Sequence, residues 1–106
     1  MILIVVKFTP KPEYAEKWLD EVAEFTQATR NEPGNMFFEW STSVDEPGTF
    51  VLVEGFTDEG AAPHVNSDHF KKGLETMRPM LASTPRIISH QIDADGFGPM
   101  GELQID

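Results

Sequence analysis

The segment from Glu54 to Phe70, E-G-F-T-D-E-G-A-A-P-H-V-N-S-D-H-F, contains the side chains best suited to acid–base chemistry. Glu54 lies near the end of an apolar run and shares a strand face with Phe50, Leu52 and Phe56. If that face is buried, desolvation raises the pKa of Glu54 and makes it a candidate general base or hydrogen-bonding acid. The alternative is a partly exposed strand end, where Glu54 binds a backbone amide or one histidine.

Two histidines follow Glu54 within one connection. Ser67 is a good N-cap, so His69 is expected in the first turn of a helix. The positive end of that helix disfavours imidazolium, which leaves a neutral ring able to donate or accept a hydrogen bond. His64 lies on the connection into the helix and can point back over the sheet. Taken singly, each histidine is more often a surface or capping residue; together with Glu54 they form a candidate proton-handling site.

A metal site is the competing interpretation, because two histidines and a carboxylate can hold Fe(II) or zinc. The i, i+5 spacing of His64 and His69 does not place both rings on one face of a helix, unlike H-E-x-x-H. We therefore expect no metal here. The chain has no cysteine, so it has no thiolate ligand, thiolate nucleophile or disulfide.

Aromatic residues near these groups can line a flat apolar pocket. They are Phe37, Phe38, Trp40, Phe50, Phe56 and Phe70. Core packing explains many of them equally well, so both interpretations stay open. His90, on the last predicted strand, is expected to be a sheet residue rather than a ligand. The sequence contains no G-x-G-x-x-G, P-loop or nucleophile elbow, and nothing in it indicates a nucleotide or flavin site.

Composition limits the function classes further. A length of 106 residues fits one domain, and the net charge is -10 with only 8 Lys and Arg. Such a chain is not expected to bind nucleic acid or an anionic membrane surface. No run approaches the roughly 18 apolar residues of a membrane span. The first residues lack a charged n-region, so no signal peptide is expected and the predicted location is the cytoplasm.

The elements that position these side chains follow the order β-α-β-β-α-β. Strands are expected at 2–9, 36–44, 49–56 and 86–93. An amphipathic helix of about five turns is expected after Pro12, and a second helix after Ser67 that Pro79 ends. This order is typical of an α+β, ferredoxin-like fold with an antiparallel sheet. Residues 1–93 form the predicted domain, and residues 94–106 form a tail.

The distribution of apolar residues along the strands also predicts that the chain forms an oligomer. Two helices cover one face of the sheet, yet the strands of the hairpin at 36–56 are apolar on both faces. The simplest cover for the second face is another copy of the same sheet, related by a two-fold axis. We therefore expect a homodimer. The tail can contact the partner subunit or fray.

The chain resembles the antibiotic biosynthesis monooxygenase family, small ferredoxin-like proteins that form dimeric α+β barrels. The matching segments are E-P-G-N at 32–35 with F-E at 38–39, D-E-P-G-T-F-V-L-V-E-G-F at 45–56, and A-A-P-H-V-N-S-D-H-F at 61–70. The resemblance covers roughly residues 1–93. Its most specific part is the acid, the aromatic residue that follows, the histidine and the S-x-H-F segment.

This resemblance implies a monooxygenase that oxidises a quinol-like or polycyclic aromatic substrate with dioxygen, without metal, flavin or haem. Glu54, His64 and His69 match the family's polar positions, and we expect Glu54 or His64 to be the base and His69 to polarise the developing oxyanion. The predicted walls of the substrate pocket are Phe38, Trp40, Phe56 and Phe70. Pro63 departs from the pattern and can change how the connection presents His64.

Two alternatives remain. The haem-degrading branch of the family needs an Asn on the first strand, a Trp before the second long helix and a His within it. Apolar residues fill that strand here, and His64 and Leu74 occupy the other two positions, so haem degradation is not expected. The other alternative is a non-catalytic dimeric binding or stress protein for a small apolar metabolite.

Overall fold

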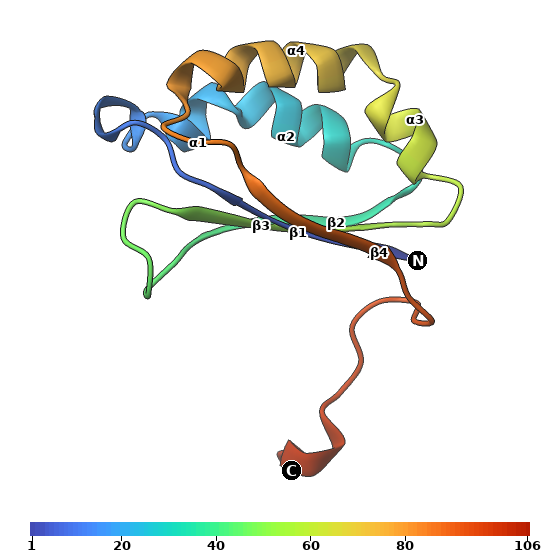
Figure 1. Ribbon diagram of the computed structural model, residues 1–106. Coiled ribbons are helices and arrows are strands. Elements are labelled where there is room, and N and C mark those ends of the chain that lie inside the picture. The colour runs from blue at the N-terminus through green and yellow to red at the C-terminus, as the bar shows by residue number, and fades with distance from the viewer.

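A computed structural model describes residues 1–106 as a four-stranded antiparallel sheet with helices on one face (Figure 1). The strands pair in the order β2-β3-β1-β4. The main elements are β1 (Ile2–Phe8), α1 (Trp18–Glu21), α2 (Ala23–Arg30), β2 (Asn35–Thr42), β3 (Phe50–Phe56), α3 (Ala61–Val65), α4 (Asp68–Met77) and β4 (Arg86–Gln91). Short 3-10 turns occupy Pro12–Tyr14, Arg78–Met80 and Gly101–Leu103. The predicted α+β, ferredoxin-like fold is confirmed, with strands one or two residues shorter than expected at several ends.

The helical connection between β1 and β2 differs from the expected single helix of five turns, so that expectation is wrong. Pro12 opens a 3-10 turn, and the helical part is divided into α1 and α2 at Val22. Val22 has φ -94° and ψ 6°, outside the helical region. β-branched residues resist helical geometry, and here the break coincides with complete burial of Val22 and Trp18 against the sheet. Packing of these side chains on the sheet therefore interrupts the helix, although the apolar residues continue at helical spacing.

The core lies between the helices and the inner face of the sheet. It is formed by Val6, Phe8, Trp18, Val22, Phe38, Phe50, Leu52, Met77 and Met80. Strand alternation puts Glu54 on this inner face between Leu52 and Phe56, as predicted, and only 6% of Glu54 is exposed. Met36 lies at the start of β2 and Val44 lies beyond its end. Both are exposed, because the β2–β3 register shifts between Asn35 and Phe37 and β2 ends at Thr42.

The N-terminal cap of α4 is confirmed. Ser67 Oγ accepts a hydrogen bond from the Phe70 N–H at 3.1 Å and donates one to the His64 carbonyl at 2.6 Å. Leu74 is 42% exposed and does not enter the core. Gly73 is buried against the Phe25 ring of α2. A Cβ at position 73 would lie 2.7 Å from that ring. The absence of a side chain at Gly73 thus lets α4 approach α2.

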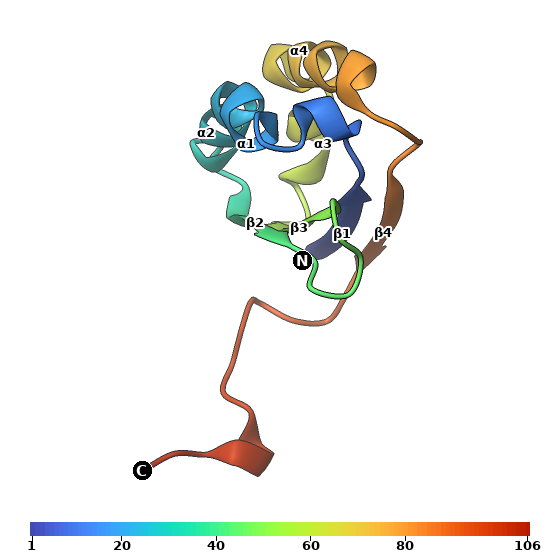
Figure 2. The same ribbon diagram turned by 90° about the vertical axis from the view of Figure 1, so that its left-hand side faces the viewer.

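The outer face of the sheet has no helix over it (Figures 1 and 2). It carries the half-buried Leu3, Val5, Val51 and Val53 and the exposed Ile88. After β4 the chain runs away from the body of the molecule on this same side of the sheet. Helices thus cover strand β1 on its inner face only.

Residues 94–106 hold several exposed apolar side chains. Phe97 is 85% exposed, yet its ring lies 5.0 Å from that of Phe37 on the outer face. Met100, Leu103 and Ile105 are also exposed. None of the helices is both long and apolar enough to span a membrane.

Candidate active site

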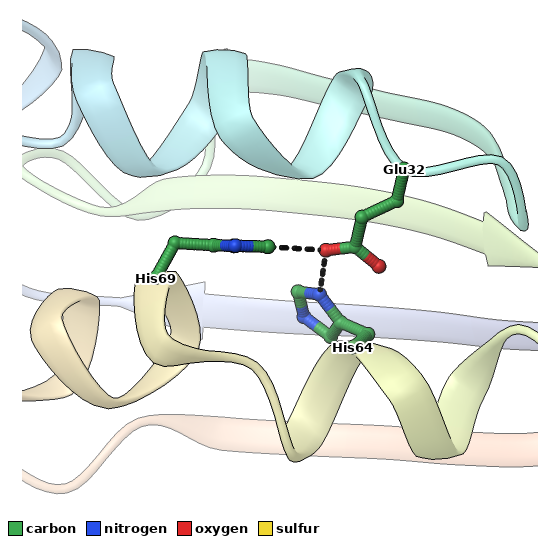
Figure 3. Close-up of side chains that lie close together, drawn as sticks. All are labelled: Glu32, His64 and His69. Carbon is green, nitrogen blue, oxygen red and sulfur yellow. Dashed lines mark hydrogen bonds and ion pairs between the residues drawn. The ribbon is translucent and has the colours of Figure 1, made fainter.

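Three titratable side chains converge where α2, α3 and α4 meet (Figure 3). Glu32 lies in the connection after α2, His64 on α3 and His69 in the first turn of α4. One oxygen, Glu32 Oε2, lies 2.7 Å from His64 Nδ1 and 2.5 Å from His69 Nε2. A single carboxylate therefore connects the two imidazoles, which we call the Glu32 cluster (Glu32, His64 and His69).

Local structure fixes the three residues relative to one another. Ser67 caps α4 and also bonds the carbonyl of His64, so the link between α3 and α4 is held at both ends. On the other side, Gly34 and Gly60 pack backbone against backbone, and a Cβ on Gly34 would lie 2.5 Å from Gly60 Cα. This close approach brings the Glu32 connection against the start of α3.

Glu54 lies beneath the Glu32 cluster. Its Oε1 is 3.9 Å from His64 Nε2, too far for a hydrogen bond but close enough for one after a small rotation. Burial, and to a lesser extent the negative charge of Glu32, raises the pKa of Glu54 from 4.5 to about 8. Glu54 is therefore predominantly a neutral carboxylic acid at pH 7.

His64 is the inner histidine and His69 the outer one. His64 is 3% exposed, with its ring 4.7 Å from Phe56 and 5.0 Å from Phe70. The side chain of His69 is 29% exposed and that of Glu32 12%. Exposure thus increases from Glu54 and His64, through Glu32, to His69.

A surface hollow of about 390 Å³ reaches the outer end of the cluster. It is lined by Glu32, Pro33, Gly34, Thr57, Glu59, Gly60, Pro63 and His69. These residues present carboxylates, a hydroxyl, an imidazole and backbone, and no large apolar side chain. The hollow therefore offers a few polar atoms that can orient a small ligand, while most of the surface that it exposes is carbon.

The aromatic residues expected to form pocket walls lie elsewhere. Phe38 and Phe56 are buried in the packed interior, and Trp40 Nε1 donates to Thr26 Oγ1 at 2.9 Å. Phe70 is half-buried against His64. None of the four lines the hollow beside His69. Their role in binding substrate stays a prediction that requires the interior to open.

Glu32 is the site residue that the sequence reasoning missed. In the sequence it stood only within the segment E-P-G-N at 32–35 that resembles the family, with no chemical role. The strand register contained a usable signal, because Asn35 pairs with Phe56 and so places Glu32 near the residues that follow β3. His90, by contrast, lies on the exposed outer side of β4, opposite Leu3.

The spacing argument against a metal is wrong, because His64 and His69 lie on two separate helices. Their ligating nitrogens and the Glu32 carboxylate lie within 4.8 Å of one another and could surround a divalent cation. The N–O separations of 2.5 and 2.7 Å are hydrogen-bond lengths, however. Ligands at about 2.0–2.1 Å around a tetrahedral zinc are separated by about 3.3 Å. The observed geometry is that of a hydrogen-bonded cluster.

Comparisons with known proteins agree with this architecture. The family model described as Antibiotic biosynthesis monooxygenase matches residues 1–76. A Bacillus subtilis (strain 168) protein named Putative monooxygenase YcnE is 32% identical over 85 residues, covering 80% of this chain and 90% of its own length. The chain therefore belongs to the antibiotic biosynthesis monooxygenase family.

Solved structures show the same fold. The structure titled Putative antibiotic biosynthesis monooxygenase from Nitrosomonas europaea superposes with a TM-score of 0.77 at 26% identity, covering 86% of this chain and 97% of the other. A structure from Caulobacter crescentus CB15 with a similar title gives a TM-score of 0.80 at 22% identity, covering 88% and 90%. At that identity the second likeness supports the fold alone.

Proposed function

We propose that this protein is a cofactor-independent monooxygenase that oxidises a small quinol-like substrate with dioxygen in the cytoplasm. The observation that carries the proposal is the Glu32–His69 pair at the wall of a surface hollow, in a chain of this family. A carboxylate bonded to one imidazole nitrogen orients the ring and stabilises the imidazolium formed when the other nitrogen takes a proton.

The order of burial supports a different role for each of the three expected catalytic residues. His69 is the base, because it is the histidine that lines the hollow. Glu54 is neutral below about pH 8 and buried, so it is poorly suited to be the first base, contrary to our expectation from the sequence. His64 holds the second hydrogen bond to Glu32 and keeps the carboxylate oriented.

The reaction needs only one proton acceptor from the protein. His69 removes a phenolic proton, and the resulting anion places negative charge on a ring carbon. An electron passes from that anion to dioxygen, and the two radicals combine to form a C–O bond. The peroxide takes a proton, loses the C–H proton at the same carbon, and breaks its O–O bond to release water. One oxygen atom enters the product, the other leaves as water, and the substrate loses two hydrogens.

The lining of the hollow, which has no large aromatic or aliphatic side chain, favours small hydroxylated rings over polycyclic aromatics. Carboxylates of Glu32 and Glu59 and the hydroxyl of Thr57 can accept hydrogen bonds from ring hydroxyls. The rest of the exposed lining is mostly carbon, but it lacks the large aromatic or aliphatic side chains that would hold a flat fused-ring substrate.

Oxygen uptake tests the proposal. The chain is supplied with hydroquinones, naphthohydroquinones and anthrones in buffer containing a chelator. We expect uptake well above the rate without protein for at least one hydroquinone, and a loss of at least about 100-fold in His69→Asn, because general acid–base catalysis contributes about that much. His90→Asn removes the same side chain on the outer face of the sheet and is the matched control. No stimulation by any substrate would refute the function and favour a binding protein.

We also propose that the protein is a homodimer that packs through the outer face of its sheet. Leu3, Val5, Val51 and Val53 form an apolar surface there that no element of the same chain covers. A two-fold axis lets this self-complementary surface cover itself. The tail of residues 94–106 leaves on that side, so we propose that it contacts the partner subunit.

A further inference from the structure

Glu32 is the single hydrogen-bond partner shared by both site histidines. Its Oε2 lies within hydrogen-bonding distance of His64 Nδ1 and of His69 Nε2. A carboxylate oxygen accepts hydrogen bonds but has no proton of its own to donate when ionised. Each of these two nitrogens must then carry a hydrogen.

The two nitrogens are different atoms of the ring, and this difference has a chemical consequence. A neutral imidazole carries only one N–H, so the nitrogen that does not face Glu32 is an acceptor. In His64 that acceptor is Nε2, which faces Glu54 Oε1 at 3.9 Å. In His69 it is Nδ1, which makes no hydrogen bond within the chain.

We infer that Glu32 is a positioning residue that holds His64 and His69 in opposite neutral tautomers, Nδ1–H in His64 and Nε2–H in His69. The His69 lone pair is then available to a substrate at the exposed end of the cluster. The lone pair of His64 is directed inward, toward the buried carboxyl group of Glu54. One carboxylate thereby gives two identical side chains different roles.

The surroundings of the cluster support this arrangement. His64 is enclosed by the rings of Phe56 and Phe70, which offer no hydrogen-bond partner that could select the other tautomer. Glu54 is a neutral acid near pH 7 and can donate to the Nε2 lone pair after a small rotation. Both partners of His64 therefore favour a hydrogen on Nδ1.

The consequence for catalysis rests on the proposed function, whereas the tautomers themselves do not. With Glu32 in place, the proton taken by His69 Nδ1 creates an imidazolium beside a carboxylate. With glutamine at position 32 this stabilisation is lost, and the rings are free to exchange tautomers. We expect Glu32→Gln to lower kcat more than it changes KM.

Nitrogen NMR of the intact chain tests the tautomers directly. Long-range ¹H–¹⁵N correlations of uniformly ¹⁵N-labelled protein distinguish Nδ1–H from Nε2–H rings. Spectra are recorded at pH 7.5, where an ordinary imidazole with a pKa of about 6.5 is mostly neutral and Glu54 is still mostly protonated. The chain has 3 histidines, so His69→Asn and His90→Asn assign all the signals. His90 serves as the reference for a ring that is remote from Glu32.

We expect the Nδ1–H pattern for His64 and the Nε2–H pattern for His69, and mixed populations for both in Glu32→Gln. Glu59→Gln alters another acid of the same hollow that bonds neither histidine, and it should leave both patterns unchanged. An Nε2–H pattern for His64 in the unaltered chain would overturn the inference, as would unchanged tautomers in a folded Glu32→Gln variant. Opposite tautomers that depend on Glu32 would support it even if no substrate stimulates oxygen uptake.

Discussion

Replacing Glu54 with glutamine should change how stability depends on pH. The pKa of Glu54 is raised from 4.5 to about 8, mainly by burial and then by the charge of Glu32. Between these pH values the folded chain binds a proton that the unfolded chain has lost, so stability falls as pH rises. The difference between the folded and unfolded pKa values corresponds to a change of about 5 kcal/mol in the free energy of unfolding, at about 1.4 kcal/mol per pH unit. This is comparable to the whole stability of many small domains, about 5–15 kcal/mol.

Glutamine has the same shape as the protonated acid and does not ionise. Glu54→Gln should therefore match the unaltered chain at pH 5 and exceed its stability increasingly up to pH 9, by as much as about 5 kcal/mol. Urea unfolding at pH 5, 7 and 9, followed by the fluorescence of the buried Trp18, measures the difference at one fixed protein concentration. Glu75→Gln, on the exposed side of α4, is the control for removing one charge. Parallel pH profiles for the unaltered chain and Glu54→Gln would refute the assignment of a neutral, buried Glu54.

Three further outcomes follow from the fold and the site. Ser67→Ala should cost about 1 kcal/mol by removing the cap of α4, whereas Ser83→Ala in an exposed loop should be nearly neutral in the same urea experiment. Val53→Lys, in the middle of the outer face, should convert a dimer to a monomer in sedimentation at micromolar concentration, and Glu75→Lys should not; a monomeric unaltered chain would contradict the proposed interface. Elemental analysis of protein purified without a metal column should find substoichiometric zinc and iron, because the Glu32 cluster is closed by hydrogen bonds; one equivalent of either metal would show that it is a metal site.

The sequence carried most of the information about the fold. Strand alternation correctly placed Glu54 on the inner face of β3, because period-2 patterning decides which side of a sheet a residue occupies. Ser67 was recognised as a cap from its residue type and the apolar pattern after it. The break at Val22 could not be read from the pattern, because helical spacing continues through it and only packing on the sheet reveals it.

The candidate site was harder to predict, because it depends on contacts between distant segments. Glu32 is 32 residues from His64, and their 2.7 Å contact is created by the close packing of Gly34 on Gly60. The aromatic residues were ambiguous for a different reason. Phe38 and Phe56 have the residue type of a pocket wall and of a core, and only their complete enclosure distinguishes the two.

The most direct test of the proposed monooxygenase is the fate of isotopically labelled oxygen. The chain and its best hydroquinone substrate are incubated under ¹⁸O₂ with a chelator present, and the product is analysed by mass spectrometry. The account predicts one ¹⁸O atom in the product and one in water, with incorporation nearly lost in His69→Asn and retained in His90→Asn. A product without ¹⁸O, or equal incorporation in both variants, would contradict it.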